Sequence, residues 1–335
     1  MPELRQDPVT GCWVVVAKER AKRPYDFIQK ENNPIQICPF EYGNESMTPP
    51  ETLAFRPDSL PPNSPDWIVR VVPNKFSAFT PEDFEETLSD GLYKHRRAYG
   101  AHEVIIHGPD HDLNLATYPV AQTTQVLKAY KMRYSYHKNQ PYGKYIQIII
   151  NHGKKAGASL EHSHSQIFAM PLIPQLPKSQ LAGAADHYDK TGRCIYCDMI
   201  ESEIKDSDRV IERTENFMVF VPYAAKLPFE TWILPSQHRP QFEEITDSER
   251  DELAGVFRRT LRRFYVGLSN PPFNMYLHTS PPGYERLESY HWHMSIIPKL
   301  TIAAGFELGT NMWINVTIPE QAAEFLKNVE TGESG

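Results

Sequence analysis

Hydrophobic and polar residues alternate over short distances along most of this chain, and the pattern predicts many short strands. We expect strands in four runs rich in β-branched and aromatic residues, at 13–16, 67–72, 103–106 and 145–150. Apolar residues follow the spacing of an amphipathic helix in two longer segments, 121–138 and 247–265. Together these elements predict the α+β class with largely antiparallel sheet.

Proline and glycine divide the chain further. Prolines cluster at 32–65 and 171–177, which argues against long helices in those segments. Glycine, alanine and polar residues gather at 180–192, where we expect a break between two domains, 1–180 and 181–335. The sequence contains neither a Gly-x-Gly-x-x-Gly motif after a strand nor a Walker-type loop, so it indicates neither a dinucleotide-binding nor a P-loop fold.

The two halves repeat one order of chemically active residues. In the first, a Cys-x-x-Glu pair is followed by His111 and then by a His-x-His pair that starts at His162. In the second, a Cys-x-x-Cys pair is followed by His238 and then by a His-x-His pair that starts at His291. The interval from His111 to His162 nearly equals that from His238 to His291, so the order indicates an internal duplication.

The second copy offers a set of metal ligands. Cys194 and Cys197 form a tight knuckle, to which His238 and His291 add imidazoles from distant strands. This Cys2His2 set suits tetrahedral zinc. The competing interpretation is a pair of buried thiols beside unrelated histidines. Four protein ligands leave no position for water, so we expect the zinc to be structural rather than catalytic.

The first copy offers a related but weaker set. Its ligands would be Cys38, Glu41, His111 and His162, with His107 as an alternative to His111. A carboxylate oxygen can ligate zinc, but one fewer thiolate should weaken the site. We expect structural zinc here as well.

The His-x-His-x-Gln stretch carries the chemistry. On a strand, His162, His164 and Gln166 would share one face, with Ile167 and Ala169 on the other. If His162 binds metal, His164 remains free, and a neutral imidazole is a good nucleophile. An amide two residues further on can donate to a phosphate oxygen. The stretch therefore suits attack on phosphorus, although an isolated motif of this kind also fits the polar face of a surface strand.

The second copy lacks part of this arrangement. His293 occupies the position of His164, but Ser295 stands where the first copy has Gln166. We therefore expect the second half to keep the metal and the first half to be catalytic.

Composition excludes several classes of protein. Lys and Arg number 35 against 42 Asp and Glu, a formal charge of -7, so there is no basic footprint for nucleic acid. No stretch approaches the roughly 18 to 20 apolar residues of a membrane span, and the polar start lacks a signal peptide's hydrophobic region. Four cysteines are too few for a disulfide scaffold. We expect a soluble, cytoplasmic protein.

The motifs resemble the galactose-1-phosphate uridylyltransferase family, the transferase branch of the histidine-triad superfamily, whose signature has Gln where hydrolase branches have a third His. The similarity covers almost the whole chain. It implies two tandem histidine-triad-like halves, each a mainly antiparallel sheet with flanking helices. It also implies a homodimer whose nucleophile, here His164, takes a nucleoside monophosphate from a nucleotide sugar and passes it to a sugar 1-phosphate or to phosphate.

The same resemblance implies roles for polar residues near the phosphates. Ser159 and Gln166 match the donors to the α-phosphate, and Asn151 falls where the family has an Asn that contacts phosphate or ribose. Arg20 and Arg23 are similar to arginines that contact substrate phosphates across the dimer interface.

The resemblance leaves the base and the sugar open. Asn74 and Phe76 match the nucleoside pocket, and Glu307 matches a residue that binds sugar hydroxyls, but Lys75 and Thr301 depart from the family pattern. The first interpretation is UDP-glucose:galactose-1-phosphate uridylyltransferase. The alternative is an ADP-glucose phosphorylase, whose plant type the motifs match more closely. A different class is a non-catalytic, zinc-stabilised nucleotide-binding module.

Overall fold

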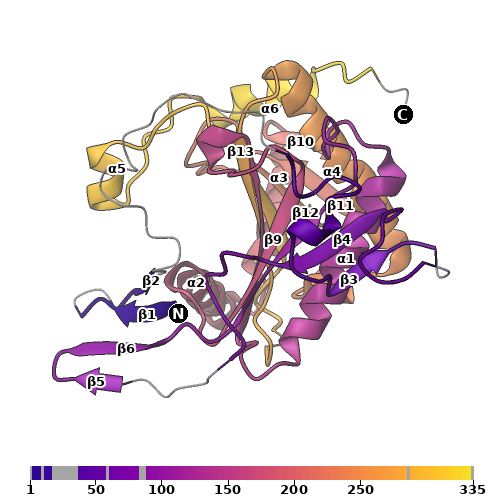
Figure 1. Ribbon diagram of the computed structural model, residues 1–335. Coiled ribbons are helices and arrows are strands. Elements are labelled where there is room, and N and C mark those ends of the chain that lie inside the picture. The colour runs from indigo at the N-terminus through magenta and orange to yellow at the C-terminus, as the bar shows by residue number, and fades with distance from the viewer. Residues whose placement is uncertain are drawn as a thin grey trace.

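The computed structural model describes residues 2–8, 11–16, 37–57, 60–82, 88–284 and 287–332, and their strands form two sheets (Figure 1). The smaller sheet has four strands and stands away from the larger one. In spatial order its strands are β2 Trp13–Val16, β1 Glu3–Gln6, β6 Tyr93–Arg97 and β5 Leu88–Asp90.

The larger sheet has ten strands, and neighbouring strands pair antiparallel throughout. In spatial order they are β10 Val210–Arg213, β11 Phe217–Phe220, β12 Thr231–Pro235, β14 His293–Pro298, β13 Phe273–His278, β8 Tyr145–His152, β9 His164–Met170, β7 Ala101–Ile106, β4 Val69–Pro73 and β3 Leu53–Phe55. All four expected strands are present, each within two residues of its predicted start.

The order of the ten strands consists of two copies of one unit, joined edge to edge. From the outer edge to the seam the first half runs β3, β4, β7, β9, β8, and the second runs β10, β11, β12, β14, β13. In each half one long helix follows the third strand: α1 Val120–Lys138 and α4 Asp247–Gly267. The expected α+β class and the two tandem halves are confirmed. The sequence did not show that β8 and β13 would join both half-sheets into one.

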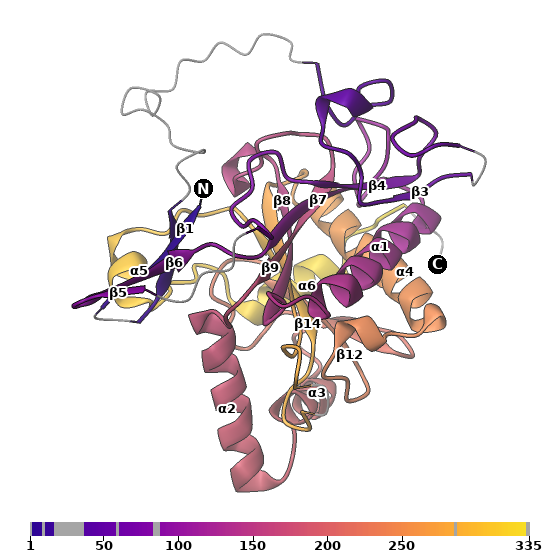
Figure 2. The same ribbon diagram turned by 60° about the horizontal axis from the view of Figure 1, so that its bottom comes forward.

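Helices α1 and α4 cover one face of the large sheet and pack against each other (Figure 2). A capping box starts α4, because the Thr246 hydroxyl accepts from the Glu249 N–H and the Glu249 carboxylate accepts from the Thr246 N–H. Under α1, Ile167 and Ala169 of β9 are fully buried in the main core. The face of β9 that carries Ile167 and Ala169 therefore packs into the core.

The segment in which we expected a break between domains is a helix. Helix α2 Gln175–Thr191 begins inside the proline-rich segment 171–177, with Pro177 in its first turn, where a missing N–H costs little. Few of its residues are buried, so its sequence shows only a weak apolar stripe and looks like a linker. Gly192, in the left-handed region at φ 68°, ends it. The division expected at residue 180 falls within α2.

The other elements are short. They are helices α3 Ile195–Asp206, α5 Gly305–Thr310 and α6 Pro319–Lys327 and the 3-10 helices η3 Glu45–Met47, η4 Lys154–Ala156 and η5 Phe242–Glu244. Helix α5 stands apart from the large sheet in both views (Figures 1 and 2). No helix within the described ranges has the length and apolar character needed to cross a bilayer.

A buried ion pair fixes α1 to β7. Arg133 of α1 donates twice to Glu103 of β7, at 2.8 Å each, and His137 lies 3.0 Å from the same carboxylate. Burial alone would raise the pKa of Glu103, but His137 and Arg133 outweigh it and hold that pKa at about 2. The carboxylate therefore contributes to stability only while it is ionised.

We expect Glu103→Gln to lower the free energy of unfolding by about 3 kcal/mol at pH 7, the size of the shift from an unfolded carboxyl. Because the folded pKa is depressed, this contribution is present above about pH 4.5 and is lost as pH falls toward 2. Denaturant unfolding at several pH values checks it. Equal losses at pH 7 and at pH 2.5 would contradict it.

Candidate active site

The second-half ligand set is assembled. Cys194 is the N-cap of α3, Cys197 lies in its first turn, His238 follows β12 and His291 precedes β14. One donor atom from each of the four lies within 4.8 Å of the others, and Cys197 Sγ is 3.5 Å from His238 Nδ1. Residues from three distant segments therefore converge on one point.

The side chains of this set are oriented toward that point. His291 donates its Nε2–H to the Gln237 carbonyl at 2.9 Å, so its buried Nδ1 faces the thiols with no hydrogen-bond partner among the described residues. Cys197, with His238 and His291, holds the pKa of the Cys194 thiol far below its usual range. Two sulfurs, one of them readily ionised, and two imidazoles form a donor set that fits zinc.

The first-half set is also assembled, but it is more open. Donor atoms of Cys38, Glu41, His111 and His162 lie within 4.8 Å of one another. Cys38 Sγ is 3.6 Å from His162 Nδ1, and Glu41 Oε1 is 3.1 Å from His111 Nδ1. Glu41 and His111 are about two-fifths exposed, and burial raises the pKa of the Cys38 thiol. His107 lies outside this group.

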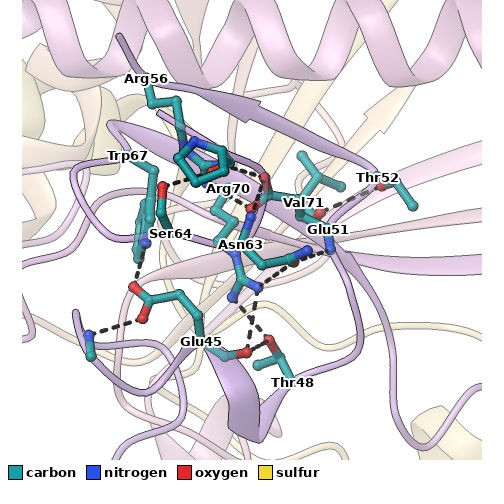
Figure 3. A network of polar contacts seen from close by, with 12 residues as sticks. Glu45, Thr48, Glu51, Thr52, Arg56, Asn63, Ser64, Trp67, Arg70 and Val71 are labelled. Carbon is teal, nitrogen blue, oxygen red and sulfur yellow. Dashed lines mark hydrogen bonds and ion pairs between the residues drawn. The ribbon is translucent and has the colours of Figure 1, made fainter. Parts of the chain in front are cut away.

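A buried polar network supports the loop that carries this first knuckle (Figure 3). Arg70 of β4 is 1% exposed, and it donates to the Glu51 carboxylate at 3.0 Å and to the Thr48 hydroxyl at 2.9 Å. Arg56 donates to both oxygens of Glu51. The network attaches the chain between β3 and the knuckle to the outer strands of the first half.

Glu45 connects that network to the knuckle. Its carboxylate accepts from the Trp67 indole N–H and from the Gly43 N–H, both at 3.0 Å (Figure 3). One residue earlier, the Asn44 amide donates to the Cys38 carbonyl at 2.9 Å. The position of the Cys38 thiol is therefore set by side chains outside the first ligand set.

A second network lies behind His164, on the α1 face. His107 is fully buried, with Nδ1 2.9 Å from the Ser163 hydroxyl and Nε2 2.5 Å from the Ser165 hydroxyl. The Tyr130 hydroxyl of α1 also bonds to Ser165. His107 therefore fixes the strand that carries His164 and has no place in the metal set.

His164 is the first residue of β9, so the strand starts two residues later than we expected and His162 precedes it. The His164 ring directs Nδ1–H to the His162 carbonyl at 2.7 Å, which leaves the Nε2 lone pair available. Burial lowers the pKa of His164, so the ring is neutral at pH 7. His164 belongs to neither ligand set. It is an oriented, neutral imidazole two residues from His162, a member of the first group that could hold a metal.

Its counterpart in the second half is enclosed. His293 is fully buried, and the Trp232 ring stacks on it at 4.6 Å between centroids. In the second half, Trp232 of β12 pairs with Ser295 of β14. The corresponding pair in the first half is Val104 of β7 with Gln166 of β9. A small side chain in the first half is thus replaced by a large one in the second, and the large one stacks on the His293 ring.

Several of the expected phosphate and nucleoside residues lie near His164. Gln166 is two residues along β9, and Asn151 follows Ile150, the β8 partner of Ser165. Ser159 is exposed in the loop before β9. Asn74 follows β4 and lines a cavity of about 580 Å3, whereas Phe76, two residues on, is 57% exposed.

Other expected residues are not brought to His164 within one chain. Glu307 lies on α5, which stands apart from the large sheet, and its carboxylate accepts from the Ala304 N–H at 2.9 Å (Figure 1). Arg20 and Arg23 lie outside the described residues.

Two polar residues at the site were missed by the sequence analysis. His102 lies on β7 with Nε2 2.8 Å from Gln166 Oε1, and Asn274 lies on β13 with Nδ2 2.7 Å from Asn151 Oδ1. Each is a polar residue in a strand that is mainly apolar, and this was the available signal.

Comparisons with known proteins agree with this geometry. The family models for the N-terminal and C-terminal domains of galactose-1-phosphate uridyl transferase match residues 1–174 and 181–333. The ADP-glucose phosphorylase of Arabidopsis thaliana is 35% identical over 98% of this chain and 93% of its own. Its crystal structure with bound ADP-glucose has a TM-score of 0.77 at 33% identity, covering 98% and 99% of the two chains.

Uridylyltransferases are similar over the same extent. That of Thermotoga maritima is 28% identical over 98% of this chain and 99% of its own. A solved structure titled as a uridylyltransferase has a TM-score of 0.82 at 31% identity, covering 97% of each chain. The chain therefore belongs to the galactose-1-phosphate uridylyltransferase family and is a nucleotidyltransferase.

Proposed function

We propose that His164 carries a nucleoside monophosphate between a nucleotide sugar and an acceptor phosphate. The observation that carries this proposal is the Nδ1–H bond of His164 to the His162 carbonyl, which leaves Nε2 unprotonated and aimed away from that carbonyl. A ring held in this tautomer needs no base to activate it. Burial keeps it neutral.

The reaction has two displacements. In the first, His164 Nε2 forms a bond to the α-phosphorus as the bond to the sugar 1-phosphate oxygen breaks, and sugar 1-phosphate leaves. In the second, an oxygen of a sugar 1-phosphate or of phosphate attacks the same phosphorus and the N–P bond breaks. Gln166, Asn151 and Ser159 would donate to the non-bridging oxygens, where negative charge builds up. Arg20 and Arg23 remain predicted contacts of the leaving phosphate.

Two substrate pairs are supported by the relatives. Uridylyl transfer between UDP-glucose and galactose 1-phosphate follows the relatives that are 25–28% identical. Adenylyl transfer from ADP-glucose to phosphate is the second candidate, and the higher identity of the plant phosphorylase favours it.

One experiment distinguishes uridylyl transfer from adenylyl transfer. The purified protein is incubated with UDP-glucose and labelled galactose 1-phosphate, and in parallel with ADP-glucose and labelled phosphate. We expect label in the nucleotide product of one pair at a rate at least about 100-fold above the other, because a single base pocket discriminates by hydrogen bonds. No exchange with either pair would contradict nucleotidyl transfer between these substrates.

We also propose that both ligand sets hold zinc. The support is their donor chemistry and the buried, unpartnered Nδ1 of His291 within the described residues. Zinc at either position would crosslink distant segments, and no step of the reaction passes through it. The second-half set, with two sulfurs and less exposure, should bind more tightly than the first.

We infer that the partner of the chain is a second copy of itself. The segment around α5 exposes apolar side chains, among them Ile302 at 95%, Leu308 at 75% and Val316 at 72%. Glu307 on this segment lies apart from His164 of its own chain, so the sugar-binding role expected for it requires another chain's site. Sedimentation of a monomer at micromolar concentration would contradict a dimer.

A further inference from the structure

We propose that His102 and Asn274 are positioning residues that turn the amides of Gln166 and Asn151 so that their N–H groups face the substrate phosphate. The inference rests on the proposed function. Each amide carries an accepting oxygen and a donating nitrogen, whereas a phosphate oxygen only accepts. Whether such an amide helps or repels the phosphate therefore depends on which protein group its oxygen already contacts.

His102 determines the orientation of Gln166. The backbone N–H of Ala78 donates to His102 Nδ1 at 3.2 Å, so the proton of the neutral ring is on Nε2. That Nε2–H donates to Gln166 Oε1 at 2.8 Å, and Phe168 stacks on the ring at 4.0 Å between centroids. Asn74 Nδ2 lies farther from the same nitrogen, at 3.1 Å, and with the ring proton on Nε2 this longer contact is not a hydrogen bond. The amide N–H groups of Gln166 therefore point away from His102.

Asn274 determines the orientation of Asn151 in the same way. The Ala156 carbonyl can only accept, and it lies 2.8 Å from Asn274 Nδ2. This contact fixes which end of the Asn274 amide is nitrogen. The second hydrogen of that nitrogen is donated to Asn151 Oδ1 at 2.7 Å, so the Asn151 N–H groups are free to face a ligand. Asn274 comes from the second half, which thus contributes to the first half's site across the β8–β13 seam.

The second half provides an internal comparison. Trp232 is the counterpart of Val104. The residue two positions earlier is His102 in the first half and Glu230 in the second. Glu230 accepts from the Trp232 indole N–H at 3.0 Å and from the Lys226 N–H at 2.8 Å. The half with Ser295 in place of Gln166 therefore also lacks the orienting histidine. Amide and histidine occur together in one half and are absent together from the other.

Double-mutant cycles test the assignment. We measure formation of the nucleotidyl-enzyme by rapid quench for Gln166→Ala, His102→Ala and the double variant. Loss of one donor should slow this step about 100-fold or more, and loss of its orienting partner about 10-fold. Because His102 acts through Gln166, the double variant should be no slower than Gln166→Ala alone. A further 10-fold loss in the double variant would overturn the assignment.

Asn274→Asp applies the same test with little change of size, and it also removes the hydrogen bond to the Ala156 carbonyl. A carboxylate in that place can only accept, so the Asn151 amide must turn its nitrogen toward it and its oxygen toward the phosphate. In the otherwise unchanged protein, we expect Asn274→Asp to slow formation of the nucleotidyl-enzyme about 100-fold. In a protein that already carries Asn151→Ala, we expect it to cause no further slowing. Equal slowing in both backgrounds would overturn the role of Asn274. The matched control for His102→Ala is His95→Ala on β6, in the smaller sheet, which should leave the rate of nucleotidyl-enzyme formation unchanged.

One readout is independent of turnover. Nitrogen-15 spectra of selectively labelled protein should show His102 with a protonated Nε2 and an unprotonated Nδ1, with or without substrate. The reverse tautomer overturns the assignment even if nucleotidyl transfer is found. The expected tautomer without any nucleotidyl transfer would leave the orientation correct and the proposed function wrong.

Discussion

Replacing His164 by alanine will abolish nucleotidyl transfer while the protein stays folded. The ring supplies the atom that bonds to phosphorus, and no other residue offers an unprotonated nitrogen held by a backbone carbonyl next to Gln166 and Asn151 within the described part of the chain. We expect kcat to fall by about 10^4-fold or more, as when other nucleophiles are removed. Steady-state transfer assays with the active substrate pair measure the loss, and circular dichroism reports the fold.

His293→Ala is the matched control. It removes the same type of side chain from the equivalent position in the second half, where the ring is fully buried against Trp232. We expect transfer to persist within a few-fold, while the free energy of unfolding falls by about 2 to 4 kcal/mol because a cavity opens in the core. Unchanged turnover in His164→Ala would contradict the mechanism and favour a non-catalytic nucleotide-binding module.

If the second-half set holds zinc, as we propose, Cys197→Ala will remove that metal and destabilise the whole protein. The set ties the N-terminus of α3 to the loop after β12 and to the residue before β14, so these segments lose a shared crosslink. We expect the midpoint of thermal unfolding to drop by roughly 10 °C, with one equivalent less zinc by elemental analysis. Treatment of the parent with a strong chelator should reproduce the drop.

Variants of the first-half set should have smaller effects on stability than Cys197→Ala. Glu41→Ala should lower the midpoint by less, since Glu41 and His111 are already partly exposed to water. Glu41→Cys should instead bind zinc roughly tenfold more tightly, because a thiolate replaces a carboxylate oxygen. If Cys197→Ala kept both its metal content and its unfolding midpoint, the structural role of the second-half set would be wrong.

Regular patterns made the strands and long helices predictable. Four apolar runs and two amphipathic segments fall where the structure has strands and helices, because three of the runs and both helices face the main core and the run 13–16 packs on a smaller cluster. The convergence of both Cys, His and Glu groups was predictable as well, since knuckle spacing and repeated order survive in the sequence. Helix α2 was not, because an exposed helix needs no apolar stripe.

Contacts between distant polar residues were not predictable. Nothing in the spacing pairs His102 with Gln166, Asn274 with Asn151, or Arg70 with Glu51, because each pair depends on strand register and on where a loop returns. The exact start of β9 was not predictable either: His162 lies ahead of the strand, with its Nδ1 3.6 Å from Cys38 Sγ. The sequence identified the chemical groups, and the fold determined their orientation.

The most direct measurement locates the intermediate. The protein is mixed briefly with ADP-glucose or UDP-glucose and no acceptor, quenched in base, digested and examined by mass spectrometry. We expect the mass of one nucleoside monophosphate on the peptide that contains His164, and on His164 itself after fragmentation. An unmodified His164 peptide from protein that turns over substrate, or a modification on another residue, would contradict the mechanism.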